Sequence, residues 1–242
     1  MNIKLRLIIM NFLQFAVWGS YLTSMGSYLV NVNLAGHIGI FYAMQGIVSL
    51  FMPAIMGIIA DRWVPAQKLL SFSHFMAAIF MGLAGYYGMT SGQDVEFGPL
   101  FGLYALSVAF YMPTLALSNS VAYTALDKAG LDTIKHFPPI RIFGTIGFIC
   151  AMWLVDILGL QNNYGQFFTC AIIGLVYGCY ALTLPACPTS KGGQSKSLVE
   201  ALGLRAFTLF KQKKMAIFFI FSMLLGVSLQ ITNGFANPYI SS

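Results

Sequence analysis

Seven long apolar runs constrain the fold of this chain more than any other feature of its sequence. They cover residues 5–30, 37–60, 68–90, 97–124, 138–159, 164–185 and 214–238, with charged or turn-forming clusters between them. A helix of about 20 apolar residues crosses the hydrocarbon core of a bilayer, so each run is long enough to span it. Backbone groups in lipid must pair within a helix or a closed barrel, and the runs lack the alternation of barrel strands. The sequence therefore predicts an all-α membrane protein with seven transmembrane helices.

The scarcity of charge excludes a soluble globular enzyme. Only 20 of the 242 residues carry a charge, 13 basic and 7 acidic, and 58% are hydrophobic. The net charge of +6 does not indicate nucleic-acid binding, because the basic residues lie between apolar runs, where the anionic cytoplasmic leaflet is their expected partner. The four cysteines lack metal-ligand spacing. We therefore expect the lipid bilayer as a partner, no nucleic acid, no metal site and no catalytic residues.

The basic residues between the runs predict the orientation. With the N-terminus inside, the outer loops hold no Lys or Arg, and the loop before residue 97 carries Asp94 and Glu96. Cytoplasmic segments of membrane proteins are enriched in Lys and Arg. The inner segments then hold every basic residue except Arg141: Lys4, Arg6, Arg62, Lys68, Lys128, Lys135, Lys191, Lys196, Arg205, Lys211, Lys213 and Lys214.

Two inner segments shape the expected domain organisation. Proline suits the first turn of a helix, so the fifth span is expected to start near Pro138, the first residue of a Pro-Pro pair. After the sixth span, a flexible stretch precedes a capping-box pattern, Ser197 and Glu200, and an amphipathic segment reaching Phe210. We expect a six-helix bundle over residues 1–185, a cytoplasmic linker with an amphipathic helix over 186–213, and a seventh transmembrane helix over 214–242.

A charged turn follows the second run, in the order Gly57-Ile-Ile-Ala-Asp61-Arg62-Trp63. It resembles the signature loop of the major facilitator superfamily, which places a Gly, an Asp and basic residues after the second helix. An Asp at a helix end pairs with an Arg or faces the positive N-terminus of a neighbouring helix. The resemblance implies that Asp61 and Arg62 form a conformational latch. The alternative is a charged turn that merely obeys the positive-inside pattern.

Longer strings carry a closer resemblance. They are Phe12-Leu-Gln-Phe15 with Trp18-Gly-Ser20, Tyr111-Met-Pro-Thr114, Phe137-Pro-Pro-Ile-Arg-Ile-Phe-Gly-Thr-Ile-Gly-Phe148, Lys214-Met-Ala-Ile-Phe-Phe-Ile-Phe-Ser-Met-Leu-Leu-Gly226, and Leu229-Gln-Ile-Thr-Asn233. Together they resemble the bacterial nucleoside:proton symporter family of the same superfamily, along the whole chain. The resemblance implies a nucleoside substrate, the proton as coupling ion with no other cofactor, and a multi-pass protein of the cytoplasmic (inner) membrane. That family has twelve spans, so a missing C-terminal half is the expected partner, holding the coupling carboxylate.

The fifth run carries the strongest candidate site. Arg141, Thr145 and Phe148 stand at i, i+4 and i+7, so they share one helical face with a cation, a hydroxyl and an aromatic ring. Arg and Thr can hydrogen-bond ribose hydroxyls or base carbonyls, and Phe can pack on a base. The resemblance implies that all three line the substrate cavity. The alternative for Arg141 is a side chain that extends to the cytoplasmic interface.

The seventh run repeats this pattern with two amides, Gln230 and Asn233, on one face. Amides in lipid need partners, so they face the bundle or a wet cavity. The resemblance implies contact with substrate, and an interhelical hydrogen bond is the alternative. Four further residues are candidates for lining the cavity, and packing between helices is the alternative role for each of them: Gln14, Trp18, Tyr21 and Asn119.

The predicted function is proton-coupled nucleoside symport by alternating access, with this chain an incomplete fragment that does not catalyse uptake alone. A permease for a sugar or another small polar solute, or a non-transporting membrane half-protein, remains an alternative. A membrane-embedded enzyme is disfavoured, because almost all acidic residues lie in loops or at helix ends. His74 is expected to be packed and neutral, without a role. The glycine pairs Gly144 and Gly147, and Gly174 and Gly178, are expected to bring helices close together.

Overall fold

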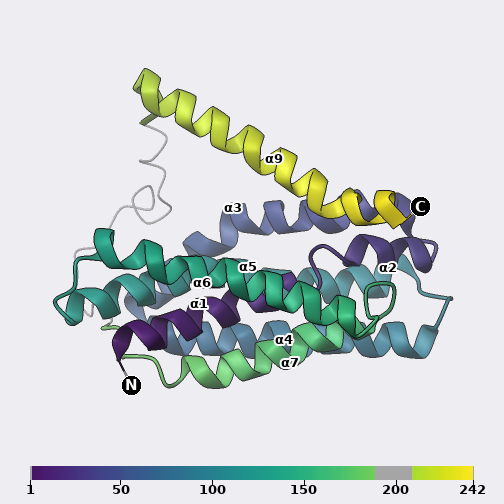
Figure 1. Ribbon diagram of the computed structural model, residues 1–242, viewed down its shortest axis with the longest axis horizontal. Helices are drawn as coiled ribbons and strands as arrows, with labels where there is room; N and C mark the ends of the chain where they lie inside the picture. The colour runs from purple at the N-terminus through teal and green to yellow at the C-terminus, as the bar shows by residue number, and fades with distance from the viewer. Residues whose placement is uncertain (1, 189–208, 242) are drawn as a thin grey trace.

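The computed structural model describes residues 2–188 and 209–241, and every regular element in these ranges is a helix (Figure 1). The elements are α1 (Ile3–Gly19), α2 (Met25–Asn31), the 3-10 turn η1 (Ala35–His37), α3 (Ile38–Arg62), α4 (Ala66–Ser91), α5 (Phe97–Lys128), α6 (Thr133–Ile157), α7 (Gly165–Ala181) and α9 (Lys213–Ser241). The predicted linker over 186–213 and its amphipathic helix lie largely in residues 189–208, outside the described residues.

Five of the predicted apolar runs form helices that are long and apolar enough to cross a membrane. They are α3 together with η1, α4, α5, α6 and α9. The sixth run forms the shorter apolar helix α7, whose 17 residues extend about 25 Å at 1.5 Å per residue. That length lies at the lower limit for a membrane-spanning helix.

The prediction of one continuous helix over the first run is wrong. Helix α1 ends at Gly19, and α2 starts at Met25 after a turn. In that turn the Ser20 hydroxyl donates to the Val17 carbonyl at 2.7 Å, and the Ser24 hydroxyl donates to the Gln166 side chain of α7 at 2.9 Å. The Val17 carbonyl is thus bonded by a side chain, and the Tyr21 amide donates to the Trp18 carbonyl instead at 3.4 Å, so the regular helical ladder is interrupted after Gly19.

The predicted start of the fifth span near Pro138 is also wrong. Helix α6 starts at Thr133, because the Asp132 carboxylate caps it by accepting a hydrogen bond from the Ile134 amide at 2.9 Å. Pro138 and Pro139 therefore lie inside the helix. The two carbonyls left without a proline donor belong to exposed residues, so they can be solvated outside the protein core.

The bundle brings its basic segments to one end. There the Tyr180 hydroxyl of α7 donates to the Arg6 carbonyl of α1 at 2.9 Å, and the Lys128 ammonium of α5 donates to the Ala186 carbonyl at 2.7 Å. At the opposite end the Asn31 amide donates to the Asn162 carbonyl at 2.9 Å. Successive helices therefore run up and down between a basic end and an end that carries the loop before α5.

Within residues 2–188 and 209–241, the contacts of α9 with α2 and α3 lie along its C-terminal half. Figure 1 shows its end beside α2 and α3, whereas its start stands apart from the other helices. At the contact, a Cβ added to Gly26 of α2 would lie 2.4 Å from the Gly234 carbonyl oxygen of α9. The apolar side chains along the rest of α9, such as Phe218, Phe221 and Leu224, are exposed at the surface.

Candidate functional site

The polar face of α6 points toward α1. The guanidinium carbon of Arg141 lies 3.7 Å above the centroid of the Phe15 ring of α1. One turn further along this face, Thr145 is exposed, and two turns further the Phe148 ring meets the Trp18 ring edge-on with centroids 6.4 Å apart. The structure therefore brings Arg141, Phe148 and Trp18 to one α1–α6 interface, with the Thr145 hydroxyl open beside it.

Glycines let these two helices touch backbone to backbone. A Cβ on Gly147 of α6 would lie 2.1 Å from the Phe12 carbonyl oxygen of α1, and a Cβ on Gly19 of α1 would lie 2.3 Å from the Phe148 carbonyl oxygen. No side chain fits at such distances, so glycine is required at both positions. The expectation that Gly144 and Gly147 serve close helix packing is confirmed, as it is for Gly174 and Gly178, which pack on α4.

Gln14 lies in a fully buried hydrogen-bond network and not on an open cavity wall. Its amide nitrogen donates to the Thr114 hydroxyl of α5 at 2.8 Å, and the His74 Nε2 of α4 lies 3.3 Å from its amide oxygen. The Tyr111 hydroxyl donates to the Gln14 backbone carbonyl at 2.7 Å. Because the Thr114 hydroxyl in turn donates to the Tyr111 carbonyl, it accepts from Gln14. The amide oxygen then faces His74, whose Nε2 carries the proton.

Trp18 belongs to a second polar chain. Its indole nitrogen donates to the Gln45 side-chain oxygen of α3 at 3.2 Å, and the Gln45 amide donates to the Tyr104 hydroxyl of α5 at 2.8 Å. Tyr21 is buried, and its ring packs edge-on against Tyr104. Sequence reasoning did not single out Gln45, although a buried amide in an apolar run is a signal of the same kind as Gln14.

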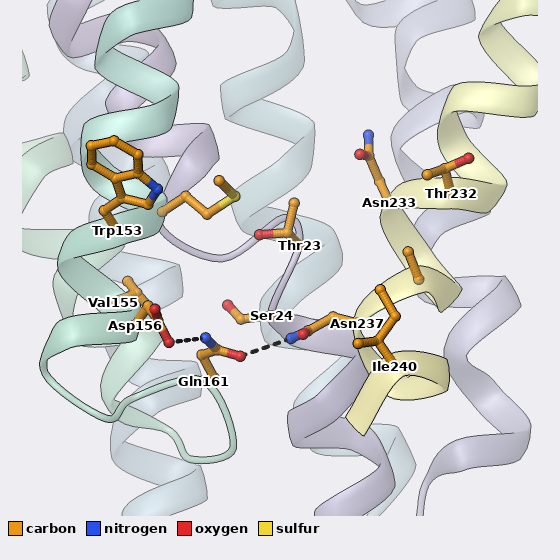
Figure 2. A pocket seen from close by; sticks show the side chains of 12 residues that line it. Thr23, Ser24, Trp153, Val155, Asp156, Gln161, Thr232, Asn233, Asn237 and Ile240 are labelled. Atoms are coloured by element: carbon orange, nitrogen blue, oxygen red, sulfur yellow. Dashed lines mark hydrogen bonds between the residues drawn. The ribbon is translucent and has the colours of Figure 1, made fainter. Parts of the chain in front are cut away.

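The amides of α9 have separate surroundings. The Gln230 amide donates to the Tyr42 carbonyl of α3 at 3.1 Å, as in the interhelical alternative. Asn233 lines a cavity of about 390 Å³ between α6, α9 and the turn after α1 (Figure 2). Other lining residues are Thr23, Ser24, Trp153, Asp156 and Thr232.

A chain of polar side chains closes one side of this cavity. In Figure 2, Asp156 of α6 accepts a hydrogen bond from Gln161, whose oxygen accepts one from Asn237 of α9 at 3.0 Å. Asn237 also donates to the Ser27 hydroxyl of α2 at 2.9 Å. Sequence reasoning missed Asn237. The signal was present, since Asn237 stands four residues after Asn233 on the same face of the helix.

The remaining predicted residues lie elsewhere. Asn119 is half-buried on α5 and does not line the cavity beside α9. Asp61 and Arg62 occupy the last turn of α3 and are both exposed. Within residues 2–188 and 209–241, no group of three or more His, Cys, Asp or Glu side chains is arranged to hold a metal ion.

The fold and this polar interior are those of a multi-pass membrane protein. The chain matches the family described as Nucleoside H+ symporter over residues 1–242, and it belongs to that family. The resemblance seen in the sequence strings is thus confirmed.

Curated relatives and solved structures agree with this assignment. Xanthosine permease of Escherichia coli (strain K12) is 44% identical over 242 residues, which cover 99% of this chain and 56% of the relative. Nucleoside permease NupG of the same organism is 45% identical, over 100% of this chain and 57% of the relative. Crystal structures of a mutant nucleoside transporter NupG and of NupG match with TM-scores of 0.85 and 0.79, at 44% identity and over 58% of the solved chain.

The chain therefore spans less than two thirds of the length of these relatives. The structural match also confirms the predicted all-α fold, an N-terminal bundle with a further helix.

Proposed function

We propose that this chain forms the N-terminal portion of a proton-coupled nucleoside transporter of the cytoplasmic membrane, which works by alternating access. The observation that carries the proposal is the α6 face, where Arg141 is stacked on α1 beside an open Thr145 hydroxyl and the Phe148 ring. The family and the relatives, two of which are named as permeases for xanthosine or nucleosides, support the same substrate class.

The position of the Arg141 guanidinium favours a substrate role over interfacial anchoring. Its partner Phe15 lies twelve residues after the start of α1, about 18 Å along the helix from the basic end of the bundle. A side chain that extends to the interface would point toward that end. At its observed place the guanidinium offers hydrogen-bond donors to ribose hydroxyls or base carbonyls, Thr145 offers a hydroxyl, and Phe148 offers an aromatic surface for a base.

We assign secondary substrate roles to Asn233 and Gln230. Asn233 lines the cavity that lies against α6, and its amide both donates and accepts hydrogen bonds. Gln230 is tied to the Tyr42 carbonyl, which leaves its amide oxygen available to a ligand. Gln14 and Trp18 do not contact substrate in this proposal. They hold α1 in place through their buried hydrogen bonds to α3, α4 and α5.

Replacing Arg141 with lysine should weaken nucleoside uptake. Lys offers a point charge in place of a planar set of donors, and hydrogen bonds from a charged group contribute about 1.5–3 kcal/mol, so the KM for uridine should rise about tenfold or more. Thr145→Val should raise it less. Uptake of radiolabelled uridine is measured with the chain co-expressed with the part of NupG beyond the matched region, in bacteria without their own nucleoside permeases.

Arg6→Lys, at the basic end of α1, is the matched control and should leave the KM unchanged. The same cells are tested with a sugar and with an uncoupler that removes the proton gradient. A wild-type KM in the Arg141→Lys variant would show that Arg141 has an interfacial role and does not bind substrate. Uptake of the sugar but not of uridine would contradict the proposed nucleoside substrate, and uptake that the uncoupler does not reduce would contradict proton coupling.

We further propose that the N-terminus lies inside, with residues 1–185, 186–213 and 214–242 as bundle, linker and seventh span, and with Asp61 and Arg62 as a latch on the cytoplasmic side. The basic residues Arg6 and Lys128 lie at the same end of the bundle, beside the C-terminal end of α7, and this supports the orientation because cytoplasmic segments are enriched in basic residues.

Cysteine labelling should show this orientation directly. In a background with its four native cysteines replaced, a membrane-impermeant maleimide added to intact cells should label a cysteine at Gln93, in the loop before α5. It should miss a cysteine at Ile134, which is 86% exposed at the start of α6. Disrupting the cells should make both sites reactive, and the reverse pattern in intact cells would overturn the assignment.

A further inference from the structure

The contact between Arg141 and Phe15 is face to face. At 3.7 Å the guanidinium carbon lies at van der Waals distance above the ring centroid. A guanidinium standing edge-on would place a nitrogen and its hydrogen between that carbon and the ring, which would hold the carbon farther away. The two planes therefore face each other, and the attraction is that of a cation over the negative face of an aromatic ring.

This stacking leaves the donors of Arg141 unused. The five guanidinium N–H groups lie in the plane of the group, whereas the ring occupies only one of its faces. The structure contains no hydrogen bond or ion pair from the Arg141 side chain to any residue in the described part of the chain. A carboxylate partner would have neutralised the cation and occupied two donors. Phe15 holds the cation without neutralising its charge and without occupying any of its hydrogen-bond donors.

Gly144 makes this arrangement possible. A Cβ at Gly144 would lie 2.6 Å from a ring carbon of Phe15 and 2.8 Å from an Arg141 guanidinium nitrogen. The glycine thus leaves the space in which ring and guanidinium meet. The Phe15 ring also packs on the Trp18 ring, with centroids 6.3 Å apart, and the backbone contacts at Gly147 and Gly19 fix α1 against α6.

We infer that Phe15 is a positioning residue for the substrate site: with Gly144 it forms an aromatic seat that holds the Arg141 guanidinium in place and presents its in-plane donors to the hydroxyl and carbonyl oxygens of a nucleoside. This inference deepens the proposed function and depends on it for the identity of the ligand. It assigns Phe15 no contact with substrate.

The test compares Phe15→Leu with Phe15→Tyr in the uptake system described above. Leu removes the aromatic face, so the KM for uridine should rise about three- to tenfold, within the range known for cation–π contacts, while the maximal rate per folded transporter stays unchanged. Tyr keeps the face and should restore a KM close to that of the unmodified protein. Phe143→Leu, an exposed Phe on α6, is the matched control and should leave the KM unchanged.

Two further measurements separate seating from packing. If Phe15 acts through Arg141, Phe15→Leu should add little in an Arg141→Lys background. An undiminished effect there, or a lower maximal rate at an unchanged KM, would overturn the inference and leave Phe15 a packing residue. The Arg141 Nε–Hε resonance in purified protein is the second readout, since the ring current of Phe15 should shift it, and the shift should disappear in Phe15→Leu but not in Phe143→Leu.

The resonance also separates the two proposals. If Arg141→Lys transports uridine normally but Phe15→Leu moves the resonance, the substrate role fails and the seat stands. If Arg141→Lys weakens uptake but Phe15→Leu changes neither the KM nor the resonance, the seat fails and the substrate role stands.

Discussion

Replacing Gly147 with alanine should separate α1 from α6 and strongly reduce the amount of folded protein. The added Cβ would lie 2.1 Å from the Phe12 carbonyl oxygen, a backbone atom that cannot move without shifting the whole of α1. Overpacking of a well-packed interior costs roughly 1–3 kcal/mol, and a clash with backbone belongs at the upper end of that range. Thermal unfolding of the purified protein in detergent measures the loss, together with the fraction that elutes as a single species.

Gly102→Ala is the matched control, because Gly102 lies within α5 and a Cβ there would meet no atom within 4 Å. Alanine favours a helix over glycine by about 0.5–1 kcal/mol, so this variant should be as stable as the unmodified protein or slightly more stable. Equal stability of the two alanine variants would show that α1 and α6 are not in backbone contact.

Replacing Gln14 with leucine should destabilise the bundle by roughly 3 kcal/mol, since each buried polar group left without a partner costs about 1–3 kcal/mol. The substitution removes the acceptor of His74 Nε2 and the donor to Thr114 together. Leucine fills a similar volume, so the loss comes from hydrogen bonding and not from a cavity. Chemical unfolding followed by tryptophan fluorescence reports the change.

Gln93→Leu makes the same chemical change at an exposed loop position and should leave the unfolding curve unchanged. A Gln14→Leu variant as stable as the Gln93→Leu variant would mean that the His74, Gln14 and Thr114 side chains contribute nothing together. Because all three are fully buried, water cannot replace the lost partner without entering the bundle.

The sequence was sufficient to predict helices and their faces. Apolar length identified five long helices, and helical spacing placed Arg141, Thr145 and Phe148 on one side of α6, because both depend on local chemistry alone. It was not sufficient for helix ends set by particular side chains. The Asp132 cap extends α6 backward past Pro138, and the turn in which Ser20 bonds the Val17 carbonyl and Ser24 bonds Gln166 of α7 divides the first apolar run.

The contacts between side chains of different helices were harder to predict from the sequence than the helix ends. Gln14 carried the same signal as any amide in an apolar run, and only the packing of α1 on α4 and α5 shows that it is enclosed. Phe15 carried no signal of its own among 21 phenylalanines. Its role depends on the register of α1 against α6, which backbone contacts at Gly19 and Gly147 fix and which no periodicity within one helix can reveal.

The backbone contact between α1 and α6 also limits how this part of the molecule can move. Side chains that interlock can change rotamer and let one helix slide over another, but carbonyl oxygens set against glycine Cα atoms have no such freedom. Any translation of α1 along α6 drives the Phe12 and Phe148 carbonyls into the neighbouring turns. We therefore expect α1 and α6 to move as one rigid body, which would keep the distance from Arg141 to Phe15 constant in any rearrangement of the helices. Within the described residues α9 meets the other helices through its C-terminal half, so its distance from this pair is the one that we expect to change.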